Sequence, residues 1–398
     1  MEKEMLAGAN TWIDAKLPDL TGMADDIFDH PELGPHEEYA SSRLCQYLEN
    51  HGFTVERGIG GLKTAFRAVW KNGKGGPNLG LLCEYDALPG LGHGCGHHMQ
   101  GPAILGAACA LQQAADDRPF TITVYGTPGE ENISGKYIMI QNGIHFEDLD
   151  VALMMHGGPA TQTDIKCLAC ADVKLAFHGK AAHAALKPEA GRSSLDATML
   201  AFHALECLRE HVPSDVKIHY NILDAGGTKA NVVPSYTCTD LYVRADTVGT
   251  VKTVLKRVEN IVRGAELMTD TRADFEVSKI LDNKIPNLTL NLILMKHARA
   301  LGAPNCQEPR ERTGSTDFAN VMHRVPGSCI RVAFVPDGTS SHSQEFIAAG
   351  KSGKAHEAVR FGAKILADTC VELIYHPEEV SAMKEEFKTR LNAEIGNS

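Results

Sequence analysis

Short apolar runs that alternate with helical segments are the feature that most constrains the fold. In the first part of the chain this pattern predicts a buried helix at Gly101–Gln113 and four strands, at residues 64–70, 79–83, 121–125 and 151–155. After Pro286 it resumes as a helix at Leu288–Leu301, a strand at Gly327–Phe334 and a helix at Gly353–Tyr375. Apolar strands that alternate with helices are typical of an α/β sheet covered by helices. The sequence therefore predicts an α/β domain.

A different pattern interrupts this alternation from about residue 171. It predicts strand, helix, strand, strand, helix and strand, at residues 173–177, 195–210, 217–223, 236–244, 248–265 and 273–278. This order is typical of a ferredoxin-like unit. The 398 residues also exceed what one typical core supports. We therefore predict an inserted domain at residues 171–284, with residues 1–170 and 285–398 as the two parts of the larger domain.

The charge and cysteine content narrow the range of partners and locations. The net charge is −11 and no cluster of Lys and Arg interrupts it, which argues against nucleic acid or an anionic membrane as partner. No apolar stretch approaches the length of a membrane span, and the charged N-terminus does not resemble a signal peptide. The 11 cysteines are odd in number and scattered, as expected for reduced thiols. These features favour a cytoplasmic protein.

The first polar segment with chemical potential follows the predicted strand that ends at Cys83. It leads into a glycine-rich stretch in which Cys95 and His97 flank a single glycine. Thiolate and imidazole are good ligands for zinc and tolerable ones for manganese. A Cys-x-His pair is short and common, so a glycine-rich loop with incidental polar residues is an equal alternative for this segment alone.

Three further polar positions follow predicted strands. Glu130 and Glu131 are adjacent and suit two different roles, because one carboxylate can bind a metal while the other acts as general base. His156 ends an apolar strand, and His342 lies in a loop after another. Singly, each fits an ordinary acidic turn or a loop histidine. Together with Cys95 they supply the ligands of a dinuclear site at strand ends, where ligand crevices of α/β sheets form.

With these motifs in this order, the chain resembles the aminoacylase and carboxypeptidase family of dinuclear metallopeptidases. The similarity runs from about Pro31 to Gly353 and is greatest with the amidohydrolase branch, which contains p-aminobenzoyl-glutamate hydrolases, auxin-conjugate hydrolases and β-alanyl-lysine-type dipeptidases. The resemblance implies a mixed-sheet α/β catalytic domain of the zinc-peptidase type with an inserted lid domain that forms a homodimer. It also implies two divalent metal ions, Zn²⁺ or Mn²⁺, and a small N-acyl amino acid or dipeptide-like substrate.

The same resemblance assigns roles to residues of the larger domain. It implies five metal ligands: Cys95, His97, Glu131, His156 and His342. Glu130 corresponds to the general base, and Asp86, in an Asp-Ala-Leu-Pro motif, to the carboxylate that orients a ligand. Gly314 belongs to a loop that resembles the lining of the substrate pocket. Water attack on the amide carbon would then use Glu130 for proton transfer.

Three residues of the inserted domain complete the implied site. His183, in Gly-Lys-Ala-Ala-His, resembles the histidine that reaches across a dimer to the neighbouring active site. Asn231 and Arg244 match a pair that binds the carbonyl oxygen and the carboxylate of the substrate, and their separation of 13 residues is that of the family. As simpler alternatives, His183 is a surface histidine of the inserted domain and Arg244 a salt-bridge partner.

Departures from the family pattern leave the substrate open. His98 replaces the usual Asp or Asn, and Glu84 stands where Asp is common. An aminoacylase, a dipeptidase and a hydrolase of non-peptide amides or amines would share this machinery. A non-catalytic relative is disfavoured because Glu130 is present. A nucleobase deaminase with one zinc ion is excluded because the sequence lacks Pro-Cys-x-x-Cys.

Overall fold

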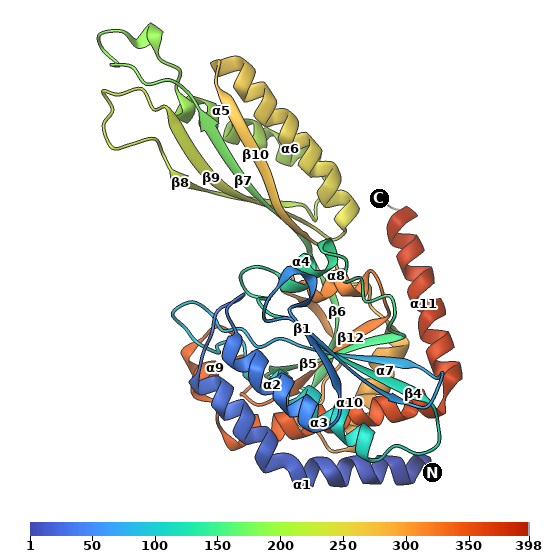
Figure 1. Cartoon of the computed structure of the whole chain (residues 1–398). Coiled ribbons are helices and arrows are strands. Elements are labelled where there is room, and N and C mark those ends of the chain that lie inside the picture. The colour runs from blue at the N-terminus through green and yellow to red at the C-terminus, as the bar shows by residue number, and fades with distance from the viewer. Residues whose placement is uncertain (397–398) are drawn as a thin grey trace. The chain divides into compact units, whose positions relative to one another are not determined.

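A computed structural model of the chain describes residues 1–396. The described residues divide into two compact units (Figure 1). The first comprises residues 1–166 and 284–392, and the second is built on residues 167–283.

The first unit contains one mixed sheet of eight strands, which confirms the predicted α/β fold class. In spatial order the strands are β1 (Thr54–Arg57), β2 (Phe66–Asn72), β4 (Phe120–Gly126), β3 (Asn78–Cys83), β5 (Val151–Gly158), β12 (Gly327–Ala333), β6 (Gln162–Cys167) and β11 (Arg310–Thr313). The four central strands, β4, β3, β5 and β12, run parallel to one another. Their carboxyl ends therefore meet at one edge of the sheet, where ligand crevices form.

Both faces of this sheet are covered by apolar packing. Side chains of a strand alternate between faces, so Leu81 packs into one core and Leu82 into the other. One face carries the larger helices: α1 (Glu2–Asp29), α2 (Glu38–Asn50), α3 (Gln100–Gln113), α7 (Leu288–Ala300) and α10 (Gly353–Tyr375). The other carries α4 (Gly135–Gln141) and α8 (Phe318–Met322). Fully buried strands explain why their sequences are continuous apolar runs.

Three strands of the sheet were not predicted from the sequence. β1 and β11 have four residues each and are largely exposed, so they lack an apolar run. β6 contains polar residues at positions that the structure buries, among them Asp164. Two other helices are the short α9 (Gln344–Ala348) and the long α11 (Pro377–Gly396).

The second unit follows the predicted order of elements. It consists of β7 (Ala169–His178), α5 (Ser194–Leu208), β8 (Lys217–Asp224), β9 (Tyr236–Ala245), α6 (Val248–Thr269) and β10 (Arg272–Leu281). The strands form an antiparallel sheet in the order β10-β7-β9-β8, and α5 and α6 cover one of its faces (Figure 1). The hydroxyls of Ser193 and Thr247 accept hydrogen bonds from the first turns of these helices and so cap them.

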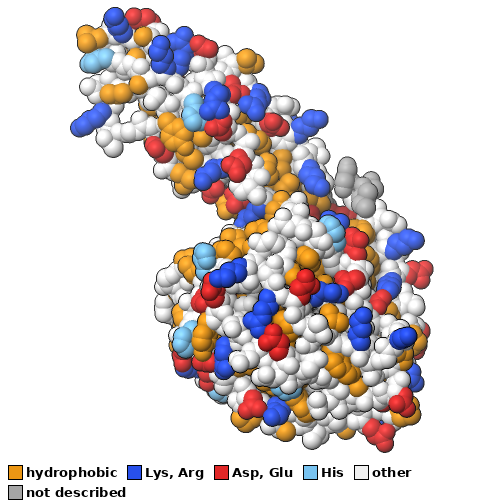
Figure 2. Space-filling view, in the orientation of Figure 1, with side chains coloured by type: hydrophobic (Ala, Val, Ile, Leu, Met, Phe, Trp, Pro, Cys, Tyr) orange, Lys and Arg blue, Asp and Glu red, His pale blue; other side chains and the backbone are white. Residues whose placement is uncertain are grey.

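The surface carries both signs of charge. On the face drawn in Figure 2, acidic and basic side chains of the described residues are interspersed. None of the helices in residues 1–396 combines the length and hydrophobicity needed to cross a lipid bilayer.

Candidate functional site

The loop after β3 brings the first predicted residues together. Cys95 is followed by Gly96, whose φ of +83° lies in the left-handed region that favours glycine, and His97 then begins a short 3₁₀ turn that leads into α3. The Nδ1 of His97 lies 3.1 Å from Oδ1 of Asp86, and both side chains are buried. A carboxylate that accepts from Nδ1 fixes the ring and directs Nε2 outward as a ligand atom.

Asp86 also holds the loop after β4. Its second oxygen, Oδ2, accepts a hydrogen bond from the backbone N–H of Glu131 at 2.9 Å. One carboxylate thus connects the histidine of one loop with the acidic pair of the next. Glu130 and Glu131 are half-buried, and the left-handed Gly129 that precedes them (φ +69°) lets the chain turn sharply out of β4.

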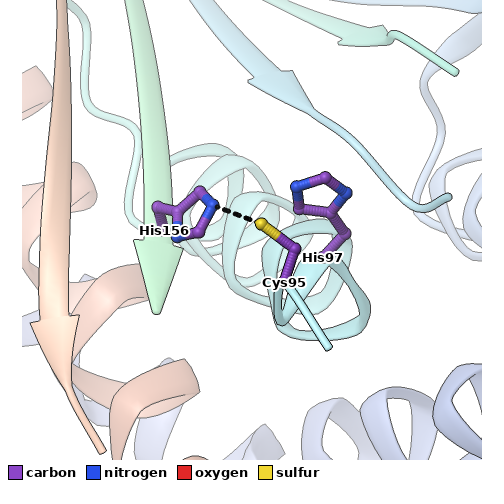
Figure 3. A group of neighbouring side chains, drawn as sticks. All are labelled: Cys95, His97 and His156. Atoms are coloured by element: carbon purple, nitrogen blue, oxygen red, sulfur yellow. Dashed lines mark hydrogen bonds between the residues drawn. The ribbon is translucent and has the colours of Figure 1, made fainter. Parts of the chain in front are cut away.

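His156 approaches the same point from β5. Its Nε2 lies 3.5 Å from Sγ of Cys95, and His97 is the third side chain of this group (Figure 3). The Nδ1 of His156 lies 2.7 Å from the carbonyl oxygen of Gly157 and 3.2 Å from Nη1 of Arg331, so both polar contacts of the ring other than Cys95 are on the Nδ1 side. Burial, together with the nearby Arg331 and His97, lowers the pKa of His156 to about 3. The imidazole is therefore neutral and available as a ligand.

His342 completes the cluster from the loop after β12. Its φ of +64° is unusual for a residue with a side chain and stores local strain, as often occurs at functional positions. Its backbone N–H donates to the carbonyl of Gly94 at 2.9 Å, which ties this loop to the loop of Cys95. Its Nε2 lies 3.3 Å from Oε1 of Glu131.

The donor atoms fit divalent cations. Three overlapping groups of these residues place one ligand atom from each member within 4.8 Å of the others: Cys95 with His97 and His156, Cys95 with Glu131 and His342, and His97 with Glu130 and Glu131. The contact of Nε2 of His342 with the buried Oε1 of Glu131 is not a hydrogen bond, so this oxygen is left without a donor, which is costly for a buried atom. Burial raises the pKa of Cys95 to about 12, so a thiolate at this position requires a neighbouring cation.

A buried ion network that the sequence analysis missed supports the cluster. Lys136 of α4 is fully buried, and its Nζ donates to Oε1 of Glu84 at 2.5 Å and to Oδ1 of Asp317 at 2.8 Å. The Nε2 of Gln100 donates to the other oxygen of Glu84 at 2.8 Å, and that oxygen lies 3.3 Å from Nε2 of His97. The sequence signal was a single lysine at a helix start shortly after the acidic pair.

The network also sets the electrostatics of Glu130. Burial, followed by the charges of Glu84, Asp317 and Glu131, raises the pKa of Glu130 well above its ordinary value. A carboxyl group in such surroundings binds a proton more readily than an exposed carboxyl group does. A general base needs this property because it accepts a proton during the reaction.

The predicted substrate residues fall in both units. Gly314 lines a cavity of about 200 Å³ that the metal-type donors also border. Nothing lies within 4 Å of a Cβ placed on Gly314, so the wall is open at this point. His183, Asn231 and Arg244 belong to the second unit. His183 and Asn231 are exposed, and the guanidinium of Arg244 lies 5.5 Å from the ring centre of Tyr242.

Comparisons with known proteins identify the family and the fold. Residues 80–371 match the model of peptidase family M20/M25/M40. The chain is 34% identical to the Xaa-Arg dipeptidase of Mus musculus, over 96% of this chain and 92% of that protein. It is 31% identical to a p-aminobenzoyl-glutamate hydrolase of Escherichia coli, over 91% and 90%. A dinuclear metal-binding M20 peptidase from Bacillus subtilis has the same fold, with a TM-score of 0.67, 19% identity and coverage of 91% and 99%.

Proposed function

Because the chain belongs to peptidase family M20/M25/M40 and is a hydrolase of amide bonds, we propose that it cleaves small N-acyl amino acids that carry a free carboxylate. The relatives named for p-aminobenzoyl-glutamate and for Xaa-Arg dipeptides support a substrate of this kind. We propose two divalent ions, Zn²⁺ or Mn²⁺, as cofactors. The observation that carries this proposal is that the groups of donor atoms overlap: Cys95 belongs to two groups, and so does Glu131. Shared residues of this kind suit two neighbouring ions.

The proposed ligands are Cys95, His97, Glu131, His156 and His342. Divalent ions held by them would polarise the substrate carbonyl and lower the pKa of a water molecule. The chain's own residues would do the rest. Glu130 takes the proton of the attacking water and delivers it to the leaving nitrogen. Asp86 keeps His97 and the backbone of Glu131 in fixed positions through its two oxygens.

The remaining roles concern substrate binding and assembly. We propose that Arg244 and Asn231 bind the substrate carboxylate and carbonyl oxygen, and that Gly314 borders the bound substrate. His183 would act on the active site of a partner chain in a homodimer formed through the domain at residues 171–284. β8 is an edge strand of that domain with exposed Ile222 and Leu223, which suits pairing with a second copy. We place the enzyme in the cytoplasm, on the basis of its 11 free thiols.

A dipeptidase is the second candidate. The observation in its favour is the similarity to the Xaa-Arg dipeptidase, which extends over 96% of this chain. Both activities would use the same metal ligands and the same base, and they differ only in the acyl group that the substrate presents.

The proposal is tested by metal removal followed by a substrate screen. Chelation should abolish hydrolysis, and Zn²⁺ or Mn²⁺ should restore it because the metals supply the activated water. The restored enzyme is then offered N-acyl amino acids and dipeptides that share one carboxyl-terminal residue. Metal analysis should give two ions per chain. Well under one ion per chain after reconstitution, or hydrolysis that survives chelation, would contradict the dinuclear model.

A further inference from the structure

One wall of the cavity beside the metal-type donors is built from charged residues that the proposed mechanism does not use. Four charged side chains line it: Asp164, Lys284, Arg310 and Arg331. They come from neighbouring elements of the first unit, because β6 carries Asp164, β12 carries Arg331 and β11 begins at Arg310, and the sheet order places β6 between the other two. The wall is therefore part of the fixed sheet edge.

Asp164 is fully engaged by the cations around it. Its Oδ2 accepts from Nζ of Lys284 at 3.0 Å, and both of its oxygens accept from Nε of Arg331, at 3.1 and 3.2 Å. The side chains of Asp164 and Lys284 are only 2% and 4% exposed. Burial disfavours the charged carboxylate, but Arg331 and Lys284 outweigh this effect and hold the pKa of Asp164 below its usual range. This carboxylate is thus already paired with two cations of the wall.

The wall as a whole carries an excess of positive charge. Apart from the metal-type cluster and its supporting network, three cations and one carboxylate line the cavity. Arg310 is exposed, and in the described part of the chain no carboxylate lies within ion-pair distance of it. Thr313, Ser315 and Thr316 border the same space. On the opposite side Glu84, Glu130 and Glu131 line the cavity, so it is this wall, and not the whole cavity, that favours an anion.

We propose that this wall binds a carboxylate on the side chain of the substrate, so that acyl conjugates of acidic amino acids are preferred. The inference rests on the proposed function and adds the class of amino acid to it. A basic side chain at this wall would meet Lys284, Arg310 and Arg331, and the only carboxylate of the wall, Asp164, is already paired with two of them. In this respect the chain differs from what the name of its Xaa-Arg dipeptidase relative would suggest. A glutamyl carboxylate would instead receive charge-assisted hydrogen bonds.

The test compares substrates that differ only in side-chain charge. Whichever acyl group the metal-loaded enzyme hydrolyses fastest, among acetyl, p-aminobenzoyl and β-alanyl, is attached to glutamate, glutamine and arginine. Glutamate and glutamine have nearly the same shape, so kcat/KM should favour the glutamate conjugate by about tenfold or more if a charge-assisted hydrogen bond forms. The arginine conjugate should be the poorest of the three.

Arg310 offers the variant, because it is exposed and its replacement leaves the core intact. Arg310→Ala should reduce the glutamate-to-glutamine ratio several-fold, and Arg310→Glu should shift the preference toward arginine. Arg324→Ala is the matched control, since Arg324 is an exposed arginine of the same unit that pairs with Glu147 and does not line the cavity. Its ratio should equal that of the wild type.

Other outcomes would overturn the inference in recognisable ways. One such outcome is equal rates on the glutamate and glutamine conjugates, with both rates lowered alike by Arg310→Ala. If both rates are also lost when the α-carboxylate becomes an amide, the wall binds the α-carboxylate and not a side chain. Preference for arginine would refute the acidic class while leaving the hydrolase intact. If nothing is hydrolysed, calorimetry with L-glutamate and L-glutamine still decides. Tighter binding of glutamate, weakened by Arg310→Ala, supports the wall even where the proposed function fails, and equal binding refutes it.

Discussion

Two ion pairs, one from each unit, lie in opposite environments. In the first unit, Lys136 and Asp317 form an ion pair with both side chains 0% exposed. In the second, the ion pair of Arg192 with Asp270 is 40% and 80% exposed, and the candidate His183 lies on the surface. Buried charges are costly to desolvate and hold a fixed geometry only when every partner is present. Exposed charges contribute little and can change partners freely. The difference indicates that the buried network of the first unit is held in a fixed geometry, whereas His183 and the Arg192–Asp270 pair of the second unit are exposed to solvent.

The largest effect on activity is expected for Glu130, which lies beside the buried network of the first unit. Glu130→Gln keeps the shape of the side chain but removes the base, so turnover should fall by about 10²–10⁴-fold. Metal content should stay that of the wild type, because the five proposed ligands are untouched. Steady-state rates and metal analysis of the same preparations check this. Loss of metal in Glu130→Gln together with retention in Glu131→Gln would show that the two roles are reversed.

The exposed residues of the second unit are tested with His183. If it donates to the developing oxyanion in a neighbouring site, His183→Ala should lose about 10²–10³-fold in turnover. A His183→Ala chain would still contain an intact metal cluster. Mixed with Glu130→Gln chains, it should form heterodimers. In one of the two sites of such a dimer, Glu130 comes from one chain and His183 from the other, so the dimer should have roughly half the wild-type activity. No recovery in purified heterodimers would mean that His183 acts within its own chain or not at all.

The ion pairs themselves give a direct comparison of the two environments. Lys136→Met leaves Glu84 and Asp317 buried without their cation, so the free energy of unfolding should fall by about 3–5 kcal/mol. Arg192→Met breaks the exposed pair and should cost at most about 1 kcal/mol. Denaturant unfolding of both variants and the wild type measures these differences. Similar losses in the two variants would remove the energetic contrast between the units.

The sequence predicted the buried parts of the fold best. The strands of the central sheet were recognisable because both faces are buried and their residues form continuous apolar runs, as in β3 and β5. The helix α10 was predicted at Gly353–Tyr375, and the structure has these bounds. β1 and β11 were missed because short exposed edge strands have no apolar pattern.

The residues of the candidate site also divide into those that the sequence indicated and those that it did not. Cys95, His97, Glu131, His156 and His342 were recognised by residue type, order and position after strands, and in the structure their side chains converge. Lys136, Asp164 and Arg331 were not recognised, because their function depends on partners far away in sequence, such as Asp317 for Lys136. A charged residue within an apolar strand, as Arg331 is in β12, was the available signal.

The last comparison concerns pH and a buried carboxylate, Asp368 of α10, whose charge its neighbours compensate only in part. Burial raises its pKa to about 6, although Asn10 donates to its Oδ1 at 2.8 Å and Lys364 and His297 are nearby. Since the unfolded pKa is about 3.9, the folded state retains a proton between about pH 4 and pH 6 that the unfolded state releases. The stability that this group contributes is therefore present below about pH 4 and lost as the pH rises through about 6.

Replacing this carboxyl group by an amide tests the sign of the effect. Asp368→Asn keeps the acceptor for Asn10 but cannot ionise, so at pH 8 the metal-free variant should be more stable than the metal-free wild type by about 1–2 kcal/mol. At pH 4 the difference should vanish. Asp274 of the second unit supplies the opposite sign, because hydrogen bonds from Arg272 and His178 lower its pKa, and the stability it contributes is lost as the pH falls. Asp274→Asn should therefore reduce stability at neutral pH and not at low pH. Parallel pH curves for Asp368→Asn and the wild type would show that the pKa of Asp368 is the same in the folded and unfolded states.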